Sequence, residues 1–188
     1  YYELDTVKKT GRNGRYFMAS RAENEAQLDL ETGSNHPDGV VIFSLFGEKM
    51  DRVVLVRQFR YPIGTYIYEL PAGLIEKGED YRSSAVREMK EETGLHFQPL
   101  EADPMYERPF YNTVGMTDES CSMVFGTCTG KVDLSGLEES EELEVVLADR
   151  GEAVRILREE RVAANCAYML MHFICDREDP FAFLHPQV

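Results

Sequence analysis

One stretch, from Gly73 to Leu95, constrains the fold of this chain more than any other; it reads GLIEKGEDYRSSAVREMKEETGL. The stretch predicts a helix over Asp80 to Thr93 with Glu88, Glu91 and Glu92 on one arc, because these lie three and four residues apart. Like charges at this spacing repel, and anions in the last turns oppose the helix dipole. A positive partner is therefore expected. The alternative is a solvated acidic helix face.

A hard divalent cation suits this arc of carboxylates. Ala85, Val86 and Met89 occupy the neighbouring arc, so the carboxylates should lie at the edge of the buried face rather than in bulk water. Mg2+, or Mn2+ in its place, binds a few carboxylate oxygens and keeps water and substrate phosphate as its other ligands. The helix therefore predicts a metal site that can hold a phosphate-bearing ligand.

The residues around the carboxylates follow the spacing G-x5-E-x7-R-E-U-x-E-E-x-G-U, where U is apolar. This spacing resembles the Nudix hydrolase box, a motif with many fixed positions and therefore a specific signal. The resemblance implies a loop-helix-loop unit that holds divalent metal against a diphosphate. The matching positions are Gly73, Glu79, Arg87, Glu88, Met89, Glu91, Glu92, Gly94 and Leu95.

The resemblance also assigns roles within the box. Glu88, Glu92 and the backbone carbonyl of Ala72 match metal ligands, and Glu91 matches a further ligand or a residue that organises the catalytic water. Glu79 and Arg87 are expected to pair and to fix the loop on the helix, since neither lies on the arc of Glu88 and Glu92; the alternative is a weak surface ion pair.

Gly73 and Gly94 have structural positions in this motif.

Hydrolysis of a diphosphate concentrates charge on phosphate oxygens, so catalysis needs metals, positioning and one base for the attacking water. That base is expected outside the helix.

The loop NTVGMTDES, from Asn112 to Ser120, offers the base. In the ADP-ribose pyrophosphatase branch of the family, the matching loop reads S-P-G followed shortly by D-E, and its glutamate activates the attacking water. Glu119 is therefore the predicted general base, with Asp118 as its rival and an ordinary polar loop acid as the alternative. Val114 stands where that branch has proline.

A second string supports the same branch. QFR, ending at Arg60, and ELPAG, ending at Gly73, lead into the box as they do in ADP-ribose pyrophosphatases. The resemblance implies that Arg60 contacts the diphosphate, which a guanidinium can bind through two hydrogen bonds. The alternative is a solvent-exposed cation at the end of a strand.

Residues 1–38 are polar with short apolar pieces and are expected to form a small N-terminal β module. Asn13-Gly14 is a turn signal and predicts a hairpin. In the resembled proteins such a module pairs with its counterpart in a homodimer. Tyr16 or Phe17, with Arg21, could then bind the adenine across the dimer, although isolated strand aromatics more often serve packing.

The remaining pattern predicts a mixed α/β domain over residues 39–188, which the resemblance identifies as a Nudix-type α/β/α sandwich with a mixed sheet. The last predicted helix carries Tyr168, Met169, Met171 and Phe173, all expected in the core. The acidic run over 134–144 is expected to be a solvated loop. Predicted strands cover 39–46, 52–59, 66–70, 96–100, 104–111, 121–129 and 144–148, and predicted helices cover 150–160 and 162–174.

Composition narrows the class of partner and the compartment. The net charge is −14, which argues against nucleic acid and anionic membranes as partners. No apolar run approaches the roughly 20 residues of a membrane span. The four cysteines lack metal-ligand spacing and are expected to be free thiols. A soluble, cytoplasmic protein is predicted.

The expected function is metal-dependent hydrolysis of ADP-ribose to AMP and ribose 5-phosphate, or of a related nucleoside diphosphate sugar. One alternative is a pyrophosphatase for a GDP-hexose or another nucleotide sugar, whose metal site would be the same. A second is a noncatalytic Nudix-like ligand sensor, although such proteins usually lack some of the box carboxylates present here.

Overall fold

The computed structural model describes residues 1–34, 36–137 and 142–184. A mixed sheet with the strand order β10-β4-β3-β9-β7 forms its centre, and three further strands extend it: β5 on β4, β6 on β3 and β8 on β9. The central strands are β3 (Gly39–Phe46), β4 (Arg52–Arg60), β7 (His96–Pro99), β9 (Ser120–Thr129) and β10 (Leu143–Ala148). The added strands are β5 (Thr65–Glu69), β6 (Ala72–Leu74) and β8 (Phe110–Tyr111).

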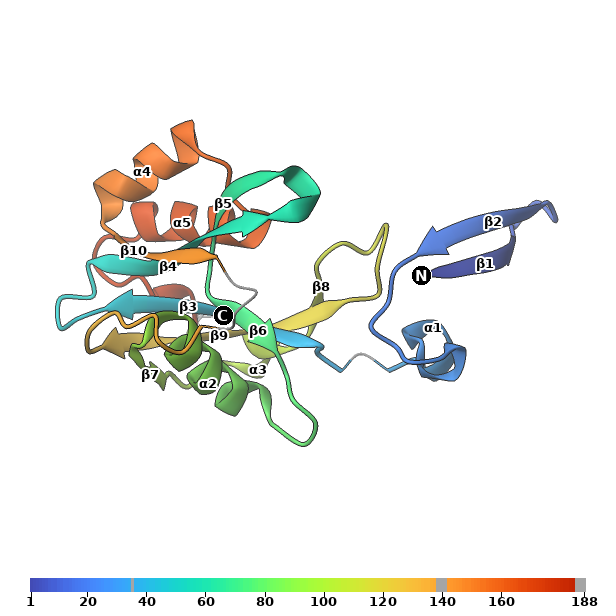
Figure 1. Cartoon of the computed structure of the whole chain (residues 1–188), viewed down its shortest axis with the longest axis horizontal. Helices are drawn as coiled ribbons and strands as arrows, with labels where there is room; N and C mark the ends of the chain where they lie inside the picture. The colour runs from blue at the N-terminus through green and yellow to red at the C-terminus, as the bar shows by residue number, and fades with distance from the viewer. Residues whose placement is uncertain (35, 138–141, 185–188) are drawn as a thin grey trace.

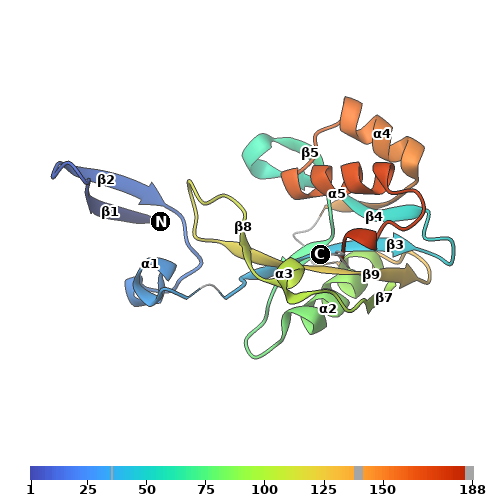
Figure 2. The same cartoon turned by 180° about the vertical axis from the view of Figure 1, so that it is seen from behind.

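Helices cover both faces of this sheet (Figures 1 and 2). β3 is apolar almost throughout, as a strand buried on both faces should be. Its Val41 and Phe43 pack against α4 (Arg150–Glu159) and α5 (Ala164–Cys175), whereas Val40 and Ile42 pack against α2 (Tyr81–Thr93). The alternation of side chains along the strand thus builds two cores, and the predicted α/β/α sandwich is confirmed.

The N-terminal hairpin exists, but its predicted turn is wrong. β1 (Tyr2–Val7) and β2 (Asn13–Met18) pair antiparallel, with Asn13 opposite Val7 inside the ladder. The turn lies over 8–12, where the Lys8 N–H donates to the Arg12 carbonyl and Gly11 has φ +78°. Gly11 therefore supplies the left-handed residue that Asn13-Gly14 was expected to supply.

This hairpin and α1 (Asp29–Thr32) lie beside the main body, next to the loop that links β8 to β9 (Figure 1). A division of the chain at residue 38 remains a prediction. The short 3-10 helices are Glu25–Gln27, Tyr61–Ile63 and Ala182–Leu184.

Two further expectations need correction. The predicted strand over 104–111 is instead α3 (Pro104–Glu107) followed by β8, because Asp103 caps the Met105 N–H and proline suits a first helical turn. In α5, Met169 and Phe173 are buried as expected, but Tyr168 and Met171 are exposed. Residues 138–141 of the acidic run lie outside the described residues.

All four cysteines are free thiols, as expected. None of the helices in the described part of the chain is long and apolar enough to cross a membrane.

Candidate active site

The helix α2 has strong stop signals at both ends. Asp80 caps its first turn by accepting hydrogen bonds from the Arg82 and Ser83 N–H groups, at 3.0 and 3.1 Å. At the other end Gly94 has φ +74°, and a Cβ atom there would lie 2.5 Å from the backbone nitrogen of Asp133. Both the turn and the close approach of the next segment require glycine at this position.

The three box glutamates of α2 have different environments. Glu92 is buried, the Glu88 side chain is 14% exposed, and the Glu91 side chain is 48% exposed. The Glu92 carboxylate accepts a hydrogen bond from the Ala72 N–H at 3.2 Å. The three carboxylates that spacing predicts on one arc of the helix therefore extend from the protein interior, beside β6, to the solvent.

Gly73 lies directly against Glu88. A Cβ atom on Gly73 would stand 1.9 Å from the carboxyl carbon of Glu88, so a larger residue would displace that carboxylate. Gly73 has no positive φ, so the close approach of Glu88 rather than backbone conformation accounts for the glycine.

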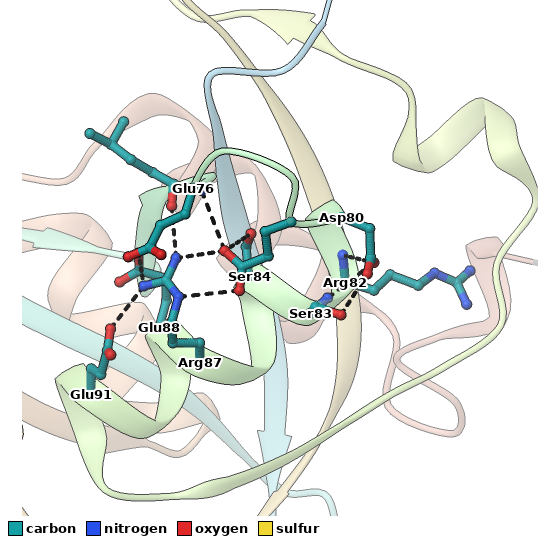
Figure 3. A network of polar contacts seen from close by, with 10 residues as sticks. Glu76, Asp80, Arg82, Ser83, Ser84, Arg87, Glu88 and Glu91 are labelled. Atoms are coloured by element: carbon teal, nitrogen blue, oxygen red, sulfur yellow. Dashed lines mark hydrogen bonds and ion pairs between the residues drawn. The ribbon is translucent and has the colours of Figure 1, made fainter.

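Arg87 joins the loop to the helix, and Figure 3 shows it beside Glu88 and Glu91. Its guanidinium binds Glu79 at 3.0 Å and the Leu74 carbonyl at 2.9 Å. The expected pairing of Arg87 and Glu79 is therefore present. The same group also binds Glu88 at 2.8 Å and Glu91 at 2.9 Å, so it supplies the positive charge that the acidic arc requires.

These contacts shift the pKa values of Glu79 and Arg87. Hydrogen bonds from Arg87 and then Ser84 lower the pKa of Glu79 from 4.5 to about 2. The hydrogen bonds to Glu79, Glu88 and Glu91 raise the pKa of Arg87 above its ordinary value. The guanidinium therefore stays charged at any working pH.

The oxygen donors at this site are of the kind that Mg2+ or Mn2+ accepts. Glu88, Glu91 and Ala72 line one cavity of about 460 Å³, and Glu92 lies behind it against Ala72. Across the described residues, no three His, Cys, Asp or Glu side chains converge on one point. Since Arg87 binds Glu88 and Glu91, those carboxylates would have to turn from it to share a cation.

A second cavity, of about 420 Å³, adjoins the first. Residues 72–74 of β6 line both cavities. Arg21, Arg60 and Glu119 line the second. The Arg60 guanidinium is held at 2.8 Å by Glu69, a residue that sequence analysis did not single out although it belongs to the string ELPAG. Arginine and carboxylate side chains from distant segments thus meet beside the box.

The loop with the predicted base contacts the N-terminal segment. Glu119 forms an ion pair with Arg21 at 2.7 Å, and Asp118 accepts a hydrogen bond from the Ser20 hydroxyl at 3.0 Å. Asp38 lies nearby, and burial raises the pKa of its carboxyl, although the Ser120 N–H opposes this shift. Glu119, not Asp118, lines the cavity with Arg60.

Tyr16 is not brought to this cavity. Its hydroxyl donates to the Gly115 carbonyl at 2.6 Å, and its ring lines a separate cavity between the hairpin and the loop over 113–118. The structure thus gathers Arg21, Arg60 and Glu119 beside the box residues and leaves Tyr16 apart.

The model of the NUDIX domain family matches residues 35–168, so this chain belongs to the Nudix family. It is similar to ADP-ribose pyrophosphatases, which confirms the resemblance to that branch. The chain is 31% identical over 144 residues to the ADP-ribose pyrophosphatase of Bacillus subtilis, an alignment that covers 73% of this chain and 72% of that protein. It is 35% identical over 116 residues to the ADP-ribose pyrophosphatase of Saccharomyces cerevisiae, covering 60% and 47%.

A methanol dehydrogenase activator of Bacillus methanolicus is also similar, with 33% identity over 128 residues, 68% of this chain and 66% of that protein. A crystal structure of an ADP compounds hydrolase has the same fold, with a TM-score of 0.61 and 18% identity over 90% of this chain and 80% of that one.

Proposed function

We propose that this Nudix hydrolase is a metal-dependent pyrophosphohydrolase that cleaves the diphosphate of ADP-ribose to AMP and ribose 5-phosphate. One observation carries the proposal: the cavity of Glu88 and Glu91 and the cavity of Arg60 and Glu119 adjoin along β6. The residues that we propose as metal ligands, phosphate-binding cation and base therefore line two adjoining cavities, which supports their action on one diphosphate. The similarity to two ADP-ribose pyrophosphatases supports the choice of substrate.

The Ala72 carbonyl, Glu88, Glu91 and Glu92 would hold Mg2+ or Mn2+, which when bound would neutralise charge on the phosphate oxygens. Gly73 leaves the space that Glu88 occupies. Arg87 and Glu79 would keep the loop against the helix while the carboxylates turn toward the cation.

Outside the box, Arg60 would bind the diphosphate oxygens, and Glu69 would hold its guanidinium in position. Glu119 would accept the proton of the water that attacks phosphorus. Its ion pair with Arg21 orients the carboxylate, and Arg21 could also contact substrate from the same cavity. Asp118 is the second choice as base, since it faces Ser20.

We propose that residues 1–38 act as a dimerisation module in a homodimer. The exposed rings of Tyr16 and Phe17 could contact a second copy, where they could also contribute to substrate binding. A cytoplasmic location accords with four free thiols.

Two other functions are alternatives to this proposal. A GDP-hexose or other nucleotide sugar would use the same box and differ only in the pockets for its base and sugar. A regulatory, noncatalytic role draws support from the relative named as a methanol dehydrogenase activator. The three carboxylates of α2 argue for catalysis, because a sensor has no need of all of them.

A substrate panel with Mg2+ tests these alternatives. Hydrolysis of ADP-ribose, GDP-mannose, UDP-glucose, NADH, diadenosine polyphosphate and a nucleoside triphosphate would be followed through phosphatase-sensitive products. The proposal expects ADP-ribose to lead in kcat/KM by about tenfold. A lead for another nucleotide sugar would keep the reaction and change the substrate. Absence of any turnover would favour the regulatory role.

A further inference from the structure

Three segments of the site meet at Asp38, the residue directly before β3. Its carboxylate accepts a hydrogen bond from the Ser120 N–H at 2.9 Å, and its own N–H donates to the Ser120 carbonyl at 2.8 Å. Its carbonyl accepts a hydrogen bond from the Ile75 N–H at 3.0 Å. Asp38 therefore joins the end of the N-terminal segment both to the loop of the proposed base and to the loop of the box.

The contact with Ser120 acts on the backbone of the proposed base. Ser120 is fully buried and directly follows Glu119 in the chain. The carbonyl of Glu119 accepts a hydrogen bond from the Asn112 N–H at 3.2 Å. The peptide group between Glu119 and Ser120 is therefore held at both of its polar ends, by Asn112 at the carbonyl and by Asp38 at the N–H. Arg21 holds the Glu119 carboxylate itself, at 2.7 Å.

The contact with Ile75 acts on the box. Ile75 directly follows β6, the strand that lines both cavities. The residue after Asp38 is Gly39, and a Cβ atom there would lie only 2.6 Å from the Gly73 carbonyl oxygen. The backbone around Asp38 is thus packed closely against the box loop. Asp38 fixes the base loop and the box loop relative to each other.

The surroundings of Asp38 do not favour a carboxylate. Burial raises the pKa of Asp38, and the negative charges of Glu119 and Asp118 act in the same direction, whereas the hydrogen bond from the Ser120 N–H opposes the shift. An aspartate that only interacts with solvent has no such cost. Asp38 lines neither the box cavity nor the cavity of Arg60, so any effect on the reaction must pass through the residues that it holds.

We infer that Asp38 is a positioning residue for hydrolysis, which sets the place of Glu119 relative to the box through its hydrogen bond to the Ser120 N–H. This inference rests on the proposed function and on Glu119 as its base. A base must lie within hydrogen-bond reach of the attacking water, and a displacement of about 1 Å can lower the rate by about a hundredfold.

Three substitutions of Asp38 separate its hydrogen bond from its charge. Asp38→Asn keeps an acceptor oxygen in place without the charge, Asp38→Glu keeps the charge but moves the acceptor by one methylene, and Asp38→Ala removes both. With Mg2+ and ADP-ribose, we expect Asp38→Asn to keep kcat within about twofold and the other two to lose about tenfold or more. KM and the metal concentration at half-maximal activity should stay within about threefold in all three variants, because the box ligands are untouched.

Hydrogen exchange without substrate gives a measurement that does not depend on turnover. In Asp38→Ala and Asp38→Glu, the backbone amides of residues 112–120 should exchange faster and those of α2 at the same rate. Asp103→Ala is the matched control, because Asp103 also accepts a hydrogen bond from a backbone N–H, that of Met105 at 2.9 Å, and lines neither cavity. It should change neither kcat nor the exchange of residues 112–120.

Three results would overturn the inference. The first is an unchanged kcat in both Asp38→Ala and Asp38→Glu. The second is a loss in Asp38→Asn as large as that in Asp38→Glu, which would assign the effect to the charge. The third is unchanged exchange over 112–120 in the slow variants. If Asp38→Ala does not fold, the comparison of Asn with Glu decides alone. Absence of turnover in the unaltered protein would count against the proposed hydrolase function, whereas hydrogen exchange still tests whether Asp38 holds the loop.

Discussion

Arg21 and Glu119 form an ion pair of 2.7 Å across 98 positions of sequence. The contact belongs to a longer parallel alignment: the Ala19 N–H donates to the Met116 carbonyl, and Ser20 binds Asp118. The N-terminal segment therefore fixes the loop that carries the proposed base. This arrangement couples the hairpin to the site even though the hairpin lies beside the main body.

Replacing the proposed base should slow catalysis without weakening substrate binding. We expect Glu119→Gln to lower kcat by roughly a hundredfold or more and to leave the affinity for ADP-ribose nearly unchanged. Gln keeps the size of the side chain and the oxygen that faces Arg21. Steady-state kinetics with Mg2+ measures both quantities.

Asp118→Asn is the matched control for Glu119→Gln, since Asp118 contacts Ser20 and does not line the cavity of Arg60. An unchanged rate in Glu119→Gln would remove Glu119 from the mechanism. A large loss in Asp118→Asn alone would transfer the role to Asp118. If both variants stayed active, the base would have to be sought outside the loop over 112–120.

Gly73→Ala should separate activity from stability. Its Cβ atom would stand 1.9 Å from the carboxyl carbon of Glu88, and the end of a glutamate side chain can move away where backbone could not. We expect the free energy of unfolding to change by less than about 1 kcal/mol and turnover to fall by about a hundredfold, because Glu88 is displaced. Urea denaturation and kinetics test the two parts. Full activity would show that the position of Glu88 is unimportant.

Arg87→Lys tests the group that holds the loop on the helix. A lysine has one ammonium and cannot bind Glu79, Glu88, Glu91 and Leu74 together, so we expect a loss of about 1 to 3 kcal/mol in the free energy of unfolding, with reduced activity. Arg155→Lys is a matched control, because Arg155 binds Glu152 of α4 and Glu160 just after it, and lines neither the box cavity nor the cavity of Arg60. It should lose stability and keep activity. Equal activity losses in both would contradict the prediction.

The low pKa of Glu79 predicts a pH dependence of stability. The pKa is about 2 in the folded protein against an ordinary value of 4.5, so folding favours the charged carboxylate. Its contribution to stability is complete above pH 4.5 and is lost as the pH falls toward about 2. Urea denaturation of the parent and of Glu79→Gln over this range should show a stability difference that shrinks with acid. A constant difference would rule out this linkage.

Chelation should abolish turnover, and added Mg2+ or Mn2+ should restore it. In Glu92→Gln we expect the metal concentration at half-maximal activity to rise by about tenfold or more, since a buried carboxylate loses its charge but keeps its shape. Glu107→Gln is the control, because Glu107 is equally buried but binds Arg82 in the first turn of α2 and does not line the box cavity. A metal requirement that rises equally in both variants would argue against a ligand role for Glu92.

Local sequence signals are sufficient to define α2 and β3. The cap at Asp80, the stop at Gly94 and the spacing of Glu88, Glu91 and Glu92 define α2, because helix period and end chemistry are properties of neighbouring residues. The strand over 39–46 has its predicted bounds, because a short apolar run rich in β-branched and aromatic residues is typical of a buried strand. The predicted position of the hairpin turn is wrong, because two turn signals, Gly11 and Asn13-Gly14, lie within a few residues of each other.

The residue pattern by itself therefore determined the box, its helix and the family of the fold. Only the tertiary structure decided that Arg21 meets Glu119, that Glu69 holds Arg60, that Glu88 fills the space beside Gly73, and that Tyr168 turns outward to face β8. The physical reason is the distance along the sequence over which each kind of interaction acts. Periodicity and caps act within a few residues, whereas these contacts depend on how a sheet and its covering helices bring distant segments together.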